Sequence, residues 1–189
     1  MKTGLFFGSF NPIHVGHLII ASYMLEFTEV EEVWFVVSPQ NPFKIHDKLA
    51  NEDHRLAMVR LAVADNPAFN AIDIEFELSK PSFTINTLHH LKERYPDREF
   101  ILIMGSDNLS ELPKWKGFEE IITDYALFVY HREGHDNQKL KARDNVRVFD
   151  APVLNISATF IREVLQARKS IRYLVPKVVR NYILENGLY

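Results

Sequence analysis

The sequence predicts an α/β fold: a doubly wound, mostly parallel sheet with helices on both faces. Short apolar runs alternate with helical patterns along the whole chain, as βαβ units require. The run Phe100–Met104 is apolar at every position, which is typical of a central parallel strand covered on both faces. The first run, Leu5–Phe7, ends at a glycine and is followed by a helical pattern, the strand–loop–helix arrangement of such folds.

The predicted strands are short runs rich in β-branched and aromatic residues. In chain order they are Leu5–Phe7, Val33–Val37, Ile72–Phe76, Phe100–Met104, Ala126–Tyr130 and Val146–Phe149. The Ile72–Phe76 run alternates apolar and acidic residues, which predicts a strand with one exposed face.

The predicted helices carry apolar residues three or four positions apart. In chain order they are Gly16–Phe27, a helix that follows Asn51, a helix that begins near Thr84, Thr159–Ala167 and Pro176–Glu185. Asn51 and Thr84 are expected to be N-caps, and Gly187 is expected to close the last helix.

Composition limits the classes of protein. The 189 residues suit one domain, 1–189, with a substantial core. There is no cysteine, which excludes disulfides, thiolate zinc sites and cysteine nucleophiles and suits a reducing cytoplasm. The net charge of -3 provides no global basic field, and no apolar run approaches the length of a membrane helix. We therefore expect a cytoplasmic protein with no nucleic-acid or membrane partner, either a monomer or a homo-oligomer.

The loop after the first strand carries two histidines, His14 and His17, on either side of Gly16. Ligands of doubly wound sheets bind beyond the carboxyl ends of the strands, and exposed amides at a helix start attract phosphate. A zinc pair would need a third ligand, and the sequence offers no obvious one. The pattern therefore favours phosphoryl chemistry over a metal site or a simple helix cap, and we expect no metal bound by the protein.

Two segments resemble the motifs of the nucleotidyltransferase superfamily, the H-x-G-H adenylyltransferases. Residues 8–17, GSFNPIHVGH, resemble its first signature, and residues 156–162, ISATFIR, resemble its second motif. Three further segments resemble bacterial nicotinate-nucleotide adenylyltransferases, so that the likeness covers nearly the whole chain: Pro81–Leu88, Gly105–Leu109 with Trp115, and Ile171–Pro176.

The chain departs from the usual motifs at three places. Asn11 stands where many relatives have aspartate, and Ala158 replaces a serine that could donate to phosphate. The segment Asn41–Lys44 reads NPFK where PPHK is more usual.

The resemblance implies a Rossmann-like nucleotidyltransferase fold with C-terminal helices and an ATP-dependent adenylyl transfer to nicotinate mononucleotide. The products would be nicotinate adenine dinucleotide and pyrophosphate, formed by direct in-line attack, with Mg²⁺ arriving on ATP. Three alternatives stay open at this point: phosphopantetheine as acceptor, the amidated mononucleotide as acceptor, and a nucleotide-binding module without activity.

The resemblance also implies residue roles. Catalytic roles fall to His14, His17, Lys44 and Arg162. ATP binding falls to Gly8, Ser9, Phe10, His14, His17, Ser157, Thr159 and Arg162. Mononucleotide binding falls to Asn41, Lys44, Thr84, Asp107 and Trp115. Several of these have a purely structural alternative: Ser157 and Asp107 as N-caps, Arg162 as a solvated side chain, and Trp115 as a loop anchor.

Overall fold

The computed structural model describes residues 1–40, 49–132 and 138–189. Six strands form one sheet in the order β3-β2-β1-β4-β5-β6, and every neighbouring pair is parallel. The strands are β1 (Lys2–Gly8), β2 (Glu32–Val37), β3 (Phe69–Ile72), β4 (Glu99–Gly105), β5 (Ala126–Tyr130) and β6 (Val146–Phe149). The strand order reverses between β1 and β4, so the predicted doubly wound sheet is confirmed.

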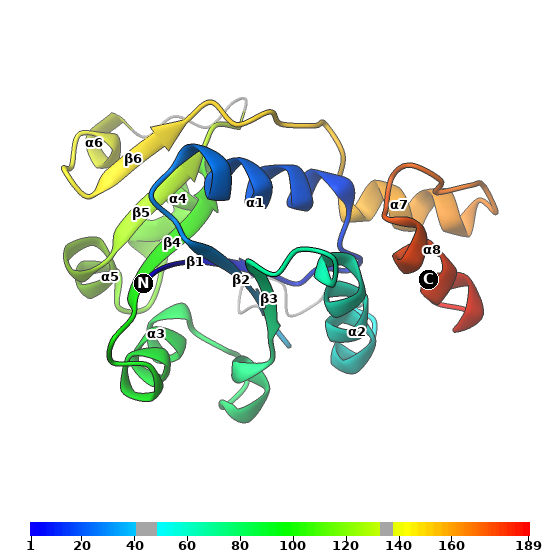
Figure 1. Cartoon of the computed structure of the whole chain (residues 1–189), viewed down its shortest axis with the longest axis horizontal. Helices are drawn as coiled ribbons and strands as arrows, with labels where there is room; N and C mark the ends of the chain where they lie inside the picture. Colours follow the sequence, from blue (N-terminus) through cyan, green and yellow to red (C-terminus); the bar gives the residue numbers. More distant parts are fainter. Residues whose placement is uncertain (41–48, 133–137) are drawn as a thin grey trace.

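Helices connect the strands and cover both faces of the sheet (Figure 1). They are α1 (Val15–Phe27), α2 (Glu52–Val63), α3 (Thr84–Arg94), α4 (Ser106–Glu111), α5 (Phe118–Asp124), α6 (Gln138–Lys141), α7 (Ala158–Gln166) and α8 (Lys177–Glu185), with 3₁₀ helices η2 (Ile74–Glu77) and η3 (Leu112–Lys114). Figure 1 shows α7 and α8 together at one end of the molecule, away from the N-terminus.

The sheet separates two hydrophobic cores, because successive side chains of a strand point to opposite faces. Phe6 of β1 packs in one core with residues of α1, α2, α7 and α8. Its neighbour Leu5 packs in the other with residues of α3, α4 and α5. The strand β4 is buried at every residue after Glu99, as the apolar run Phe100–Met104 predicts, and β1 is buried from Thr3 to Phe6.

The prediction of a strand over Ile72–Phe76 is wrong. The strand β3 ends at Ile72, and the chain continues as the 3₁₀ helix η2. The cause is Glu75, which is buried because its carboxylate accepts hydrogen bonds from Ser82 and Thr87. In a strand Glu75 would share a solvated face with Asp73, and these two bonds would be lost.

Helix starts agree with the predictions in two cases and differ in one. The Asn51 side chain accepts from the amide of Asp53, and that of Ser157 accepts from the amide of Phe160, so both residues are N-caps. Thr84 is the first residue of α3 and its N-cap is Phe83, which has no capping side chain. The prediction of Thr84 as a cap is therefore wrong.

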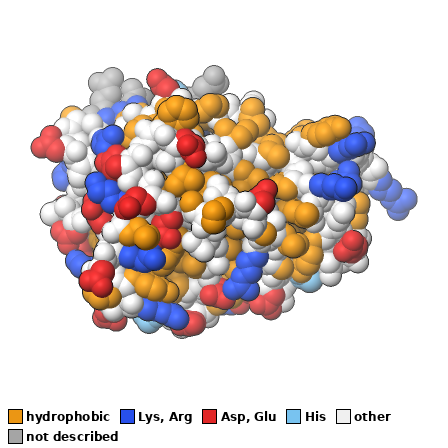
Figure 2. Space-filling model, viewed as in Figure 1, with side chains coloured by type: hydrophobic (Ala, Val, Ile, Leu, Met, Phe, Trp, Pro, Cys, Tyr) orange, Lys and Arg blue, Asp and Glu red, His pale blue; other side chains and the backbone are white. Residues whose placement is uncertain are grey.

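The surface in the view of Figure 2 mixes acidic and basic side chains on the side of α5 and β6, whereas hydrophobic side chains are concentrated toward the middle and α7. Among the described helices, none is both long enough and apolar enough to cross a bilayer.

Candidate active site

The principal cavity has a volume of about 920 Å³ and lies where the strand order reverses. Its walls come from the loop after β1, the carboxyl ends of β4 and β5, and the start of α7. Every residue that the sequence analysis assigned to ATP lines it: Gly8, Ser9, Phe10, His14, His17, Ser157, Thr159 and Arg162. Segments at opposite ends of the chain thus meet in one cavity, as parallel topology predicts.

His14 and His17 form a stacked pair at the start of α1. Their ring centroids are 3.7 Å apart with an interplanar angle of 28°. The amide of His14 donates to Nδ1 of His17 over 3.2 Å. The edges of the Phe6 and Phe10 rings pack against His17 and fix its plane. The pair is therefore held in place before any ligand binds.

The environment of His14 keeps its imidazole neutral. Burial, and secondarily the positive charge of Arg132, lowers the pKa of His14 to about 4. Its Nδ1 is buried without a hydrogen-bond partner among the described residues. A buried polar atom without a partner is costly in a folded protein and marks a position where a ligand can supply the missing bond.

The second motif packs directly onto the first. Nη1 of Arg162 donates to the carbonyl of Asn11 over 2.8 Å, and Nη2 donates to Oγ1 of Thr159 over 3.2 Å. A Cβ at Gly16 would lie 3.0 Å from both His14 Nδ1 and Ile156 Cγ2, so a larger residue there would push the two motifs slightly apart. The solvated alternative for Arg162 is therefore wrong, because its guanidinium bridges the two motifs.

Asp107 lies at the carboxyl end of β4, in the first turn of α4. Its Oδ2 accepts from Nη1 of Arg132 over 3.1 Å, while Oδ1 is buried and has no hydrogen-bond partner in the described structure. The carboxylate occupies the space that a Cβ of Gly105 would fill, with Oδ1 only 2.2 Å from that point. The N-cap of α4 is Gly105, so the interpretation of Asp107 as a cap is wrong.

A second cavity of about 390 Å³ adjoins the first, and Phe7, Gly8 and Asn108 line both. Its other lining residues combine aromatic rings, hydroxyls, two lysines and one acid: Ser38, Glu75, Ser82, Phe83, Thr84, Lys114, Trp115 and Lys116. Small-molecule sites combine such apolar faces with a few polar groups.

The floor of this second cavity is a polar cluster around Glu75. Ser82 Oγ and Thr87 Oγ1 each donate to its carboxylate over 2.7 Å, and the Ser38 side chain donates as well. Burial raises the pKa of Glu75 above its usual range, although the three hydroxyls oppose the shift. The segment that leads into α3 is thereby tied to the end of β2.

Two residues with an expected role in mononucleotide binding, Asn41 and Lys44, lie outside the described residues. Trp115 is half-buried against the core and also lines the second cavity with Thr84, whereas Asp107 lines the first. Among the described residues, no group of three or more His, Asp or Glu side chains is placed to hold a metal ion.

Three polar residues in or behind the two cavities were not predicted from the sequence: Arg55, Glu75 and Arg132. Arg132 follows β5 at the edge where ligands bind, and that rule could have found it. Arg55 lies four residues before Val59, on the inward face of its helix, where a charge is unusual. No local signal marks Glu75, which sits in an alternating run.

Comparisons with known proteins agree with this geometry. The family model described as cytidylyltransferase-like matches residues 5–164. Curated relatives named probable nicotinate-nucleotide adenylyltransferase include one from Cytophaga hutchinsonii, 53% identical over 100% of this chain and 98% of its own. Another, from Flavobacterium johnsoniae, is 47% identical over 100% and 99% of the two chains.

A solved structure shares the fold. The Plasmodium falciparum nicotinic acid mononucleotide adenylyltransferase complexed with NaAD superposes with a TM-score of 0.84 at 20% identity, covering 100% of this chain and 97% of its own.

Proposed function

Because the chain belongs to the cytidylyltransferase-like family, and within it to the nicotinate-nucleotide adenylyltransferases, we propose that it transfers the adenylyl group of ATP to nicotinate mononucleotide. The products are nicotinate adenine dinucleotide and pyrophosphate, and the reaction is a step of NAD biosynthesis. The whole chain acts as one catalytic domain.

The observation that carries this proposal is the pair of adjoining cavities. The larger is lined by both phosphate motifs and has the volume for a nucleoside triphosphate; the smaller offers Trp115 and Phe83 as flat aromatic faces. In this proposal the acceptor phosphate and the α-phosphate of ATP meet at the wall that the two cavities share, at Gly8 and Asn108.

The reaction needs charge control more than it needs a base. A phosphate monoester is already largely ionised at neutral pH, since its second pKa is about 6. One of its oxygens attacks the α-phosphorus in line, the bond to the oxygen bridging toward the β-phosphorus breaks, and that oxygen leaves with pyrophosphate. No covalent enzyme intermediate forms. Catalysis therefore consists of positioning and electrostatic stabilisation.

His14 and His17 stabilise the charge that develops at the α-phosphate. His17 receives the His14 amide at Nδ1, so its neutral ring carries the proton on Nε2 and donates from there. Arg162 contributes a fixed positive charge at the start of α7, where the amides of Ala158 and Thr159 also favour anions. Arg162 and these amides bind the β- and γ-phosphates.

The acceptor lies in the second cavity. Trp115 stacks on the pyridine ring, and Thr84 at the start of α3 meets the ring carboxylate. Asp107, which lines the larger cavity beside Asn108 of the shared wall, binds the ribose. Lys44 and Asn41 complete the acceptor site in this proposal. Discrimination between nicotinate and nicotinamide then depends on the few polar contacts around Thr84.

Mg²⁺ accompanies ATP. Hard oxygen ligands suit this ion, and it keeps several waters when it binds nucleotides. The described residues offer no cluster of three metal-binding side chains, so in our proposal triphosphate oxygens hold the ion.

Pyrophosphate release tests the proposal. The protein is incubated with Mg-ATP and, in separate reactions, nicotinate mononucleotide, nicotinamide mononucleotide or phosphopantetheine, with an acceptor-free control for ATP hydrolysis. We expect fastest release with nicotinate mononucleotide and a dinucleotide of the corresponding mass. Release with phosphopantetheine alone would overturn the proposal.

A further inference from the structure

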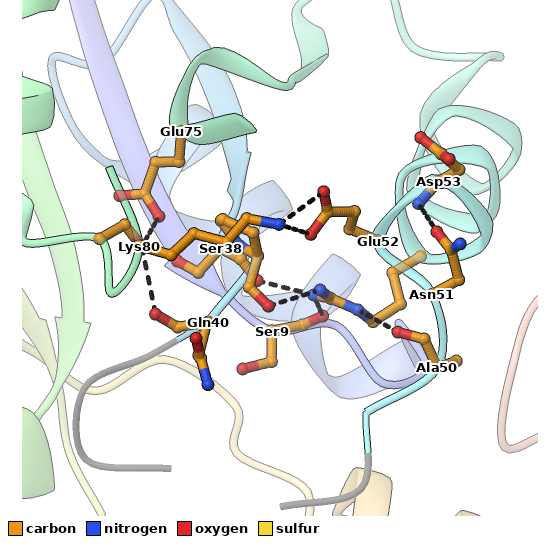
Figure 3. A network of polar contacts seen from close by, with 12 residues as sticks. Ser9, Ser38, Gln40, Ala50, Asn51, Glu52, Asp53, Glu75 and Lys80 are labelled. Carbon is orange, nitrogen blue, oxygen red and sulfur yellow. Dashed lines mark hydrogen bonds and ion pairs between the residues drawn. The ribbon is translucent and has the colours of Figure 1, made fainter. Parts of the chain in front are cut away.

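Arg55 is a buried arginine that touches neither cavity, yet binds the loops that form both. Its side chain leaves α2 and is 1% exposed. Its four hydrogen bonds to described residues all go to backbone carbonyls: Nε to Ala50 over 2.9 Å, Nη1 to Ser9 and Ser38 over 2.7 Å each, and Nη2 to Pro39 over 2.9 Å. Figure 3 shows Ser9, Ser38 and Ala50 close together, and their carbonyls accept these bonds.

Burying a charge bonded only to carbonyls is a costly way to fill a core. A guanidinium loses strong hydration on burial, and an apolar side chain of similar volume often serves stability as well. Desolvation lowers the pKa of Arg55, which is the expected sign for a buried cation. The planar fork does offer what no apolar residue can, namely several donors in a fixed relation.

One nitrogen joins the two substrate loops. Nη1 bonds both Ser9, which lines the larger cavity, and Ser38, which lines the smaller. Ser9 follows β1 and Ser38 follows β2, and Ser38 N also donates to the carbonyl of Gly8 over 2.9 Å. Nη1 thus adds a second link between these loops, beyond the backbone bond that continues the β1–β2 ladder, and this link reaches one residue of each cavity.

The bond to Ser9 also orients the next amide. In a trans peptide the C=O and N–H point in opposite directions, so the Phe10 amide points away from Arg55. Phe10 lines the larger cavity and has a φ of 44°, a left-handed conformation that costs a phenylalanine free energy. Arg55 offsets that cost by holding the Ser9 carbonyl.

Arg55 holds the loop after β2 in the same way, and this loop is hydrogen-bonded to Ser82. The carbonyls of Ser38 and Pro39 are turned toward Arg55, and the next residue, Gln40, accepts from the amide of Ser82 over 3.3 Å. Ser82 in turn binds Glu75 beneath the smaller cavity. Arg55 therefore bonds Ser9, Ser38 and Pro39, and the next residue, Gln40, is linked through Ser82 to Glu75 (Figure 3).

We infer that Arg55 is a positioning residue for the adenylyl transfer: from behind the site it directs the Phe10 amide toward the α-phosphate and fixes the loop that carries the acceptor relative to it. This inference rests on the proposed function and adds a residue that contacts neither substrate. Misplacement of about 1 Å between reacting groups can cost roughly 100-fold in rate, so the effect belongs in kcat.

The test compares Arg55→Lys with Arg60→Lys on the same helix, where Arg60 is exposed and pairs with Asp73. Lysine keeps the charge but has one nitrogen, which cannot reach all four carbonyls. We expect kcat per folded molecule to fall at least roughly tenfold in Arg55→Lys, while the Kd of a non-hydrolysable ATP analogue changes less than about threefold. Arg60→Lys retains wild-type kcat.

A purely structural role gives a different result: Arg55→Lys then lowers Tm but keeps wild-type kcat per folded molecule, which overturns the inference. A wild-type protein that releases no pyrophosphate with any acceptor instead overturns the proposed function.

A second measurement needs no variant. In the wild-type protein, the Phe10 amide proton resonance should move downfield when the ATP analogue binds; an unchanged resonance under saturation also overturns the inference.

Discussion

The imidazole of His14 stacks on that of His17 at 3.7 Å, and the backbone amide of the first donates to the ring of the second. The first turn of α1 thus presents two imidazoles to the larger cavity, and the stacking and this hydrogen bond fix their orientations. One of them, His14, is kept neutral by burial and by Arg132. The two histidines therefore differ in function: His17 has a defined donor, whereas His14 has an unsatisfied buried nitrogen.

Replacing His17 by alanine should lower kcat for pyrophosphate release by roughly 100-fold, because a donor to a developing charge in a closed site is worth that much. His89→Ala is the control, since His89 pairs with Glu120 at the surface. A His17→Ala enzyme with near-normal kcat would show that the imidazole is no transition-state donor.

His14 should make the fold sensitive to mild acid. Its folded pKa of about 4 lies below the unfolded value of 6.5, so between these values the unfolded chain binds more protons and stability falls as pH falls. From pH 7 to pH 5 this linkage amounts to about 2 kcal/mol. Urea unfolding at both pH values should show wild type losing that much more stability than His14→Gln. Equal losses in the two proteins would contradict the low pKa.

Glu75 should show the opposite dependence. Burial raises its folded pKa, so its contribution to stability is present at low pH and is lost as pH rises through the folded pKa. Glu75→Gln removes this titration, and the unfolding free energy of the variant relative to wild type should therefore rise with pH above 4.5. Glu77→Gln, on the exposed side of η2, is the matched control. A difference that does not vary with pH would count against a raised pKa.

Trp115→Ala should weaken the binding of the acceptor and leave the binding of ATP nearly unchanged. Loss of a stacking face costs about 1 kcal/mol, so KM for nicotinate mononucleotide should rise roughly fivefold to tenfold while KM for ATP stays within about twofold. Trp115→Phe keeps an aromatic face and should recover most of the loss. Equal increases in both KM values would return Trp115 to the role of a loop anchor.

Arg162→Lys should weaken the binding of ATP and leave the binding of the mononucleotide nearly unchanged. The guanidinium binds Asn11 and Thr159 at once, a fork that lysine cannot reproduce. We expect KM for ATP to rise roughly tenfold, with KM for the mononucleotide nearly unchanged, in initial-rate measurements that vary each substrate separately. An unchanged KM for ATP would mean that Arg162 only braces the first motif.

The local patterns of the chain determined most of the fold. Apolar runs and helical periodicity located all six strands within a few residues except at β3, and the residues of the two motifs that were expected to bind ATP line one cavity. The short helices α5 and α6 were not predicted, because fewer than two turns carry little periodicity. These features are local, and each can be recognised within ten or so consecutive residues.

The polar interior was decided only by tertiary structure. The periodicity of α2 places Arg55, unlike Arg60, on the inward face, but its partners Ser9 and Ser38 lie 46 and 17 residues away. Likewise Glu75 is buried because Ser82 and Thr87 return to it from the start of α3. Whether a charged side chain is buried depends on whether distant groups satisfy its hydrogen bonds, and a local pattern holds no information about those groups.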